Sequence, residues 1–378
     1  MPILPLIQST SPTLAEAMRV CMLRAGLSRV QGIDVYVLGN PKAWLGTAYH
    51  RVLERLPELI AAGSGAMALL DVLWNEEIER LAQHASEHPL NRRFGEPPFW
   101  RGYHLVLATL RLRVKEMIGS NRGPVRQSTA CQQHTLREQD VSAFGGRLKG
   151  KPDLARADDI IDFKTGSIYE TDDLESPVAL KQAYVRQLCI YGYLIHHATG
   201  RWAQRGLLYP IAGPPVQVNL EPGACTHEAT EAVELLDRYN DAVAGAKDQN
   251  ELASPSPESC KWCPYKIVCP AFWRTANESW AGRLNGEAVA GRLTRAPQAV
   301  HTDMAFALAI DADAGTSPPG PTALTPFPAA VHGVLAGLIE GSHVRVVSLG
   351  RRTNGQMFPT LWTVAIPMAL APLFPTTS

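Results

Sequence analysis

The sequence predicts an α/β protein, because three textures follow one another along its 378 residues. Up to about residue 120 the apolar residues recur with helical spacing. From about 128 to 275 short β-like runs alternate with helices, and beyond about 276 only short β-like pieces remain. A chain of this length is expected to form two or three domains. We therefore expect a helical N-terminal part (1–127), an α/β core (128–275) and a small all-β module (276–378).

Four helices are expected in the N-terminal part, at about 12–25, 47–62, 66–86 and 99–119. The first has the clearest boundaries, since Ser11 suits an N-cap, Pro12 a first turn, and Gly26 the position after the last turn. In the core, β-like runs with Gly-rich turns fill 128–165. A helix at about 178–197 should end before Gly200, a strand at about 201–211 should follow, and a last helix is expected at about 226–244.

The C-terminal module is expected to be all β. Its β-like pieces are "LNGEAVAGRL", "HGVLAGLIEG", "HVRVVSLGRR" and "TLWTVAIP", and they surround a Pro-rich break, "GTSPPGPTALTPFP". A small barrel of the OB kind is one fold that suits this pattern, although no binding motif marks it.

Net charge and hydropathy exclude fewer classes of function than the motifs do. Lys+Arg and Asp+Glu both number 36, so any basic groove for nucleic acid would have to be local. The opening "MPILPLIQSTSP" lacks a basic leader and is broken by prolines. No apolar run approaches the roughly 18 residues of a membrane span, so a cytoplasmic protein is expected.

The stretch "GKPDLARADDIIDFKTG" (150–166) places acids beside an apolar strand. If 160–165 is a strand, Asp162 and Lys164 share one face and Ile161 and Phe163 the other. A hairpin through "ARAD" would bring Asp153 alongside Asp162, and two adjacent carboxylates suit Mg²⁺ or Mn²⁺. Lys164 could then hold a water or stabilise a phosphoryl oxygen. The alternative is a solvated strand face without a metal.

The next helix carries Gln187 and Tyr191 four residues apart, on a stripe extended by Leu180, Tyr184 and Leu194. A glutamine within an apolar stripe needs a hydrogen-bonding partner. The alternative is a core helix with one satisfied amide.

Together, "GKPDLARADDIIDFKTG" and "RQLCIYGYL" resemble the PD-(D/E)XK nuclease superfamily in its RecB-like branch, over about residues 9–275. The resemblance implies a restriction-endonuclease-like core, a mixed sheet flanked by helices, that cleaves DNA with Mg²⁺ or Mn²⁺. By the motif, Asp153, Asp162 and the carbonyl of Phe163 bind the metal. Lys164 orients water or stabilises charge, and Gln187 and Tyr191 position the DNA backbone or the lysine.

The same resemblance nominates two further residues for the active site. "WLGTAYHRVLERL" is similar to the segment of the RecB-like branch in which a helical histidine reaches the metal, which nominates His50. A structural or merely exposed histidine is the alternative. Glu138 is a candidate for one more acid near the site.

"CKWCPYKIVCP" gives Cys260, Cys263 and Cys269, and such crowding among seven cysteines indicates a metal site in a reducing compartment. A fourth ligand would complete a tetrahedral set. In iron–sulfur members of the RecB-like branch, the CRISPR-associated adaptation nucleases and AddB-type subunits, the fourth cysteine lies far upstream. "SPTLAEAMRVCMLRAGLSRV" resembles that segment and nominates Cys21, with Met22 where the family has Pro. A structural [4Fe–4S] cluster is expected, with Zn²⁺ as the alternative; Cys131, Cys189 and Cys225 are the other candidate ligands.

These observations predict a metal-dependent deoxyribonuclease acting on ends or single strands, in DNA repair, CRISPR adaptation or phage defence. The alternatives are a catalytically silent DNA-binding or scaffolding subunit and an interaction module of a larger complex. Because the chain has no Walker A motif, ATP-driven unwinding would need a helicase partner.

Overall fold

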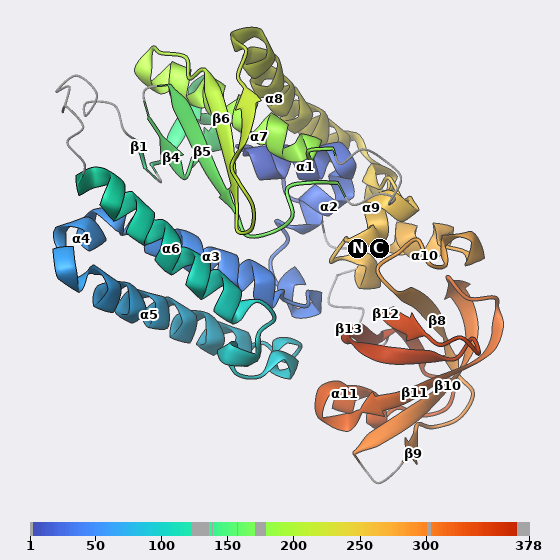
Figure 1. Cartoon of the computed structure of the whole chain (residues 1–378). Helices are drawn as coiled ribbons and strands as arrows, with labels where there is room; N and C mark the ends of the chain where they lie inside the picture. The colour runs from blue at the N-terminus through green and yellow to red at the C-terminus, as the bar shows by residue number, and fades with distance from the viewer. Residues whose placement is uncertain are drawn as a thin grey trace.

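The computed structural model describes residues 3–122, 136–137, 139–156, 158–170, 179–300 and 304–368. Three bodies of secondary structure can be followed in Figure 1: a sheet with helices on both faces, a group of long helices beside it, and a C-terminal barrel. Among the described residues no helix is both long and apolar enough to span a bilayer.

A five-stranded mixed sheet, in the order β1-β4-β5-β6-β7, forms the centre of the first body. β5 and β6 run parallel, and the other neighbours are antiparallel. A separate hairpin, β2 with β3, lies against α7. The strands are β1 (Leu136–Arg137), β2 (Val141–Ala143), β3 (Leu148–Gly150), β4 (Leu154–Ala155), β5 (Asp159–Lys164), β6 (Arg205–Pro210) and β7 (Val216–Asn219).

Helices cover both faces of this sheet, and the alternation along β5 shows how (Figure 1). Ile160 belongs to the apolar cluster that also contains α1, α2, α7 and α8. Ile161 and Phe163 point the other way, into the cluster formed with α3, α4, α5 and α6. The helices are α1 (Pro12–Val20), α2 (Met22–Leu27), α3 (Pro41–Glu54), α4 (Leu56–Ala61), α5 (Ala66–Glu87), α6 (Tyr103–Arg122), α7 (Gln182–Thr199) and α8 (Pro222–Gly245).

The predicted single helix at 12–25 is wrong in one respect that matters for function. It divides into α1 and α2 at Cys21, whose backbone is extended at φ −166° and ψ 114°. Gly26 lies inside α2 rather than after it, at a position where a Cβ would lie 2.7 Å from the Tyr239 hydroxyl. The second expected helix is likewise two, α3 and α4. Gly200 does end α7, in the left-handed conformation expected of a C-terminal glycine.

The C-terminal module is a closed barrel. Its strands are β8 (Glu287–Leu293), β9 (Gln298–Val300), β10 (Ala305–Gly315), β11 (Gly320–Pro328), β12 (His343–Arg351) and β13 (Met357–Pro367). They pair in the order β11-β13-β12-β8-β10-β9, and an additional β11–β10 pairing closes the ring. The five closing strands and the helix α11 (Ala329–Ala336) between the third and the fourth have the connectivity of an OB barrel.

Two expectations for this module were wrong. "HGVLAGLIEG" is not a strand: its first residues finish α11, whose His332 and Leu335 are buried. The Pro-rich "break" contains β11, which tolerates its prolines because it is registered with β13 at the single pair Leu324–Met357 and so needs few N–H donors on that side.

The barrel contacts both other bodies. Towards the long helices, the Arg93 guanidinium donates to the carbonyl oxygens of Leu361 and Thr363, and Phe94 packs on Trp362 with ring centroids 5.5 Å apart. Towards the sheet domain, β12 and β13 lie against the three-residue turn η8 (Lys266–Val268). α9 (Pro257–Lys261) and α10 (Pro270–Thr275) flank this turn and lie between the barrel and α2 (Figure 1).

Candidate active site and cysteine pocket

Asp162 and Lys164 face α7 from β5, where they form a polar group with Gln187. The Lys164 Nζ lies 2.6 Å from Asp162 Oδ2 and donates to Gln187 Oε1 at 2.9 Å. The Gln187 amide nitrogen in turn lies 3.4 Å from Asp162 Oδ1 and 3.2 Å from the Tyr191 hydroxyl. Each charged group therefore has a polar partner, although the Asp162 side chain is buried, with only 5% of its surface exposed. The amide of Gln187 fixes the relative orientation of the acid and the base.

Asp153 lies just before β4 and contacts β5 through its carboxylate. The backbone N–H of Phe163 donates to Asp153 Oδ2 at 2.6 Å, and His50 Nδ1 lies 3.3 Å from Asp153 Oδ1. The structure thus brings together the histidine of α3, the acid before β4 and the acidic strand β5, as the motifs predict. Phe163, whose carbonyl is the other nominated ligand, follows Asp162 directly on β5.

Two glycines explain why these elements can come so close. A Cβ on Gly46 would lie 2.7 Å from Thr165 Oγ1, so only glycine lets α3 approach the end of β5 and carry His50 over Asp153. A Cβ on Gly150 would lie 2.7 Å from Leu194 Cδ1 and 3.0 Å from the ring of Tyr191. Gly150, the glycine of the G-x-x-D motif, therefore lets α7 pack closely against the site.

The electrostatics of Asp162 favour a bound cation. Burial raises the pKa of Asp162 to about 6; Lys164 opposes this effect, and the neighbouring Asp153 adds to it. A second positive charge near these two carboxylates would favour their ionised form. Two carboxylates and an imidazole form a donor set that fits Mg²⁺ or Mn²⁺.

Tyr184 is a site residue that the sequence reasoning placed only in an apolar stripe. Its ring lies under the Lys164 ammonium, with Nζ 4.3 Å from the centroid, and the Lys181 ammonium lies 5.6 Å from the same centroid. An ammonium over an aromatic face is stabilised by about 0.5–2 kcal/mol. The spacing of three residues from Gln187 was the signal that could have identified it, since both side chains share one helix face.

The four nominated cysteines line one pocket: Cys21, Cys260, Cys263 and Cys269. The extended residue between α1 and α2 supplies the first, and the segment from α9 to α10 supplies the others. The N–H of Phe272 donates to Cys269 Sγ at 3.4 Å. Burial raises the pKa of Cys263 to about 12 and that of Cys269 to about 11, so a bound cation would be needed to hold them as thiolates at neutral pH. This donor set fits a thiolate-bound metal group.

The other candidates do not join either site. Cys189 on α7 and Cys225 on α8 are both buried and free. Cys131 and Glu138 lie outside the described residues. Within the described chain, the one set of His, Cys, Asp and Glu whose ligand atoms all lie within 4.8 Å is His227, Glu228 and Glu231 on α8. Its glutamates already pair with Arg19, so it is an ordinary surface ion-pair network.

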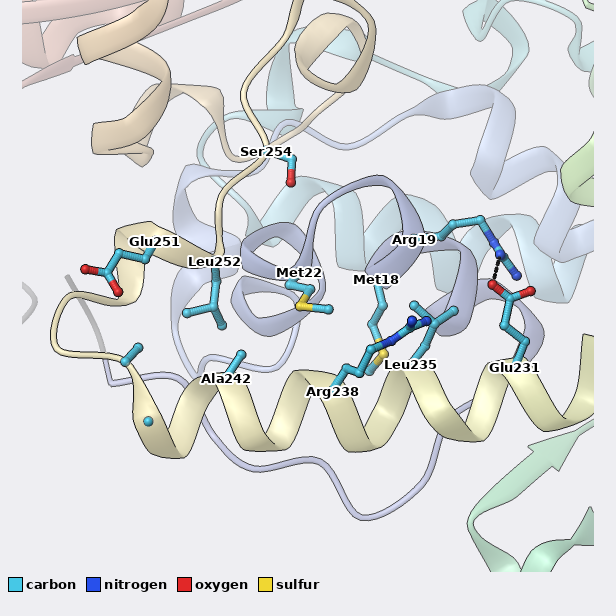
Figure 2. Close-up of a pocket in the computed structure, with 12 residues that line it drawn as sticks. Met18, Arg19, Met22, Glu231, Leu235, Arg238, Ala242, Glu251, Leu252 and Ser254 are labelled. Atoms are coloured by element: carbon cyan, nitrogen blue, oxygen red, sulfur yellow. Dashed lines mark hydrogen bonds and ion pairs between the residues drawn. The ribbon is translucent and has the colours of Figure 1, made fainter.

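A cavity of about 570 Å³ lies between α1, α8 and the segment 251–254 (Figure 2). Met18, Met22 and Leu235 form an apolar floor, and Arg19 pairs with Glu231 at the rim. None of the nominated site residues lines this cavity, so its size does not mark the reactive centre.

Comparison with known proteins agrees with the motifs. The sequence profile of the PD-(D/E)XK nuclease superfamily matches residues 9–270, and the chain belongs to this superfamily. With the mixed sheet and its flanking helices, this match confirms the restriction-endonuclease-like core. A crystal structure named "Putative exonuclease", from Eubacterium rectale, is similar at 12% identity with a TM-score of 0.36, over 64% of this chain and 83% of that one. No curated protein matches the sequence.

Proposed function

We propose that the chain is a Mg²⁺- or Mn²⁺-dependent deoxyribonuclease that hydrolyses phosphodiester bonds. The observation that carries the proposal is the contact between Lys164, Asp162 and Gln187 beside the Asp153–His50 pair. A silent family member would be expected to lack an acid or the lysine, and this chain has the full set.

In this proposal Asp153, Asp162, His50 and the Phe163 carbonyl hold the ion. When bound, the ion would polarise the phosphoryl group and acidify a water molecule. Lys164, held at 2.9 Å by Gln187, would stabilise the negative charge that develops on the phosphoryl oxygens during hydrolysis. Gln187 and Tyr191 keep that ammonium directed towards the carboxylates, and Asp153 keeps the His50 ring oriented.

For the cysteine pocket we propose a structural [4Fe–4S] cluster bound by Cys21, Cys260, Cys263 and Cys269. A cluster is preferred to a single Zn²⁺ ion because the cysteine segments resemble those of the iron–sulfur members of the RecB-like branch.

The biological setting we propose is cytoplasmic processing of DNA ends or single strands, in repair, CRISPR adaptation or phage defence, with a helicase or other subunit as partner. We also propose that the chain is divided into three parts, residues 1–127, 128–275 and 276–378.

The test is cleavage of linear single-stranded, linear duplex and circular single-stranded DNA, and of RNA, with Mg²⁺, Mn²⁺ or EDTA. Asp162→Ala and Lys164→Ala should each reduce the rate by at least about 1000-fold. Asp159→Ala is the matched control, because this acid lies on the same strand but pairs with Arg205 at the surface. Unchanged cleavage by Asp162→Ala would refute the assignment, whereas tight DNA binding without cleavage by the wild type would indicate a silent subunit.

A further inference from the structure

Lys266 is a buried lysine that the proposed chemistry does not use. It is 6% exposed, lines the cysteine pocket, and donates from Nζ to the Lys261 carbonyl oxygen at 3.2 Å. In the described part of the chain no carboxylate lies within 4 Å of its ammonium. Its electrostatic partners are the thiols of Cys263 and Cys260. Since a buried charge is costly without a counter-charge, four neutral thiols leave Lys266 uncompensated.

A second cation, Arg345 of the barrel, contacts the cysteine segment next to the pocket, whereas Arg24 of α2 lines the pocket itself. Arg345 of β12 donates from Nη1 to the Ile267 carbonyl oxygen at 3.4 Å, and its guanidinium lies 5.4 Å from the ring centre of Trp273. Its Nε is buried without a hydrogen-bond acceptor among the described residues. Arg345 interacts electrostatically with Cys269 and, more weakly, with Asp313.

The turn η8 connects these two cations, because it begins at Lys266 and its Ile267 carbonyl accepts from Arg345. Cys263 precedes the turn and Cys269 follows it in the chain; both line the pocket, and β12 and β13 of the barrel contact the turn. Four thiolates on a doubly charged group, a [4Fe–4S]²⁺ cluster or a Zn²⁺ ion, leave a net charge of about −2. Such a group would fix both ends of the turn and attract both cations.

We propose that Lys266 and Arg345 are the counter-charges of an anionic metal–thiolate group in the cysteine pocket, and that Arg345 thereby links barrel docking to occupancy of that pocket. The inference rests on the cysteine part of the proposed function. It does not depend on nuclease activity.

Hydrogen–deuterium exchange of the full-length protein tests the link, with peptides that cover β12 and the connection at 281–286. Iron and zinc are first measured in anaerobically purified protein, and exchange is compared before and after removal of the metal with a chelator. In the wild type, removal should accelerate exchange in β12 several-fold. Arg345→Met should show fast exchange even when loaded, and Arg345→Lys should be intermediate. Arg352→Met is the control, since this arginine lies over Phe358, one residue past the far end of β12.

Lys266→Met separates the charge from a packing role. A methionine of similar volume removes a buried charge, so the metal-free variant should be as stable as the metal-free wild type, or more stable. The loaded variant should lose its metal to a chelator at least about 10-fold faster than the wild type, and Lys266→Arg should restore retention. Metal-containing protein whose β12 exchange does not change on metal removal would overturn the inference. Protein that binds no metal would overturn the cysteine-site proposal and the inference with it, whatever the cleavage assay shows.

Discussion

The carboxylate–lysine site and the cysteine pocket differ in whether their charged side chains have oppositely charged partners within the chain. In the first, Lys164 pairs with Asp162, and His50 Nδ1 lies 3.3 Å from Asp153, so each acid has a polar partner within the chain itself. In the second, Lys266 lines a pocket of thiols, and neither Lys266 nor Arg345 has a carboxylate within 4 Å among the described residues. Under the proposed function, the first site can be assembled without its ion, whereas the second would gain its negative partner only when a metal group is bound. The first site would then take a dissociable ion and the second a resident group.

Removal of a pocket cysteine should have the largest effect. We expect Cys260→Ser to lose the bound metal and to lower the free energy of unfolding by several kcal/mol, because metal binding and folding are coupled at structural sites. Metal analysis and thermal unfolding measure both. Cys189→Ala is the matched control and should keep the metal, with a loss of about 1 kcal/mol for a small buried truncation. Full metal content in Cys260→Ser would exclude it as a ligand.

His50→Ala should leave the fold intact and weaken Mn²⁺ binding by at least about 10-fold, since it removes a donor that Asp153 orients. Isothermal titration with Mn²⁺ gives the affinity, and saturating Mn²⁺ should restore part of the cleavage rate. His84→Ala, on the neighbouring helix α5, is the control. Equal affinities of His50→Ala and wild type would limit His50 to a structural role.

Tyr184 tests how much the aromatic face contributes at the carboxylate–lysine site, because its ring contacts the Lys164 ammonium. Tyr184→Leu should lower kcat by roughly 5- to 30-fold, equivalent to about 1–2 kcal/mol, with little change in KM. Tyr184→Phe keeps the aromatic face and should stay within about 2-fold of wild type. If the phenylalanine variant is as impaired as the leucine variant, the hydroxyl rather than the ring is important.

The smallest predicted effect is a pH dependence of stability. Burial raises the pKa of Asp162 from its ordinary value of 3.8 to about 6 in the folded protein. Ionised Asp162 therefore destabilises the metal-free protein most above pH 6, and this cost decreases as the pH falls from 6 towards 3.8. The stability of Asp162→Asn relative to wild type should thus be higher at pH 7 than at pH 5, by about 1 kcal/mol. Chemical unfolding in EDTA at both pH values measures it, and a pH-independent difference would contradict the raised pKa.

The local parts of both sites could be predicted from the sequence because their chemistry lies in short segments. The alternation of "IIDFKT" placed Asp162 and Lys164 on one strand face, and the four-residue spacing placed Gln187 with Tyr191. The order of the helices and the all-β texture of the last hundred residues were also visible.

Contacts between distant segments could not be predicted in this way. Arg345 lies 78 residues from Ile267, whose carbonyl oxygen it contacts, and no periodicity relates the two. The break at Cys21 was hidden because the residues on both sides have good helical spacing. β11 was missed because proline normally argues against a strand, a rule that fails where the partner strand needs few donors.

The N-terminal segment has a consequence for how the protein is made on the ribosome. The N–H of Ile7 donates to the Asn240 side chain, 233 residues later, and Cys21 needs the segment that ends at Cys269 to complete its pocket. The long helices α3 to α6 can pack as soon as they emerge, but α1 and α2 must wait for most of the chain. A ribosome stalled before residue 260 would therefore display the amphipathic start of the protein unprotected, which is where we expect a chaperone to be needed.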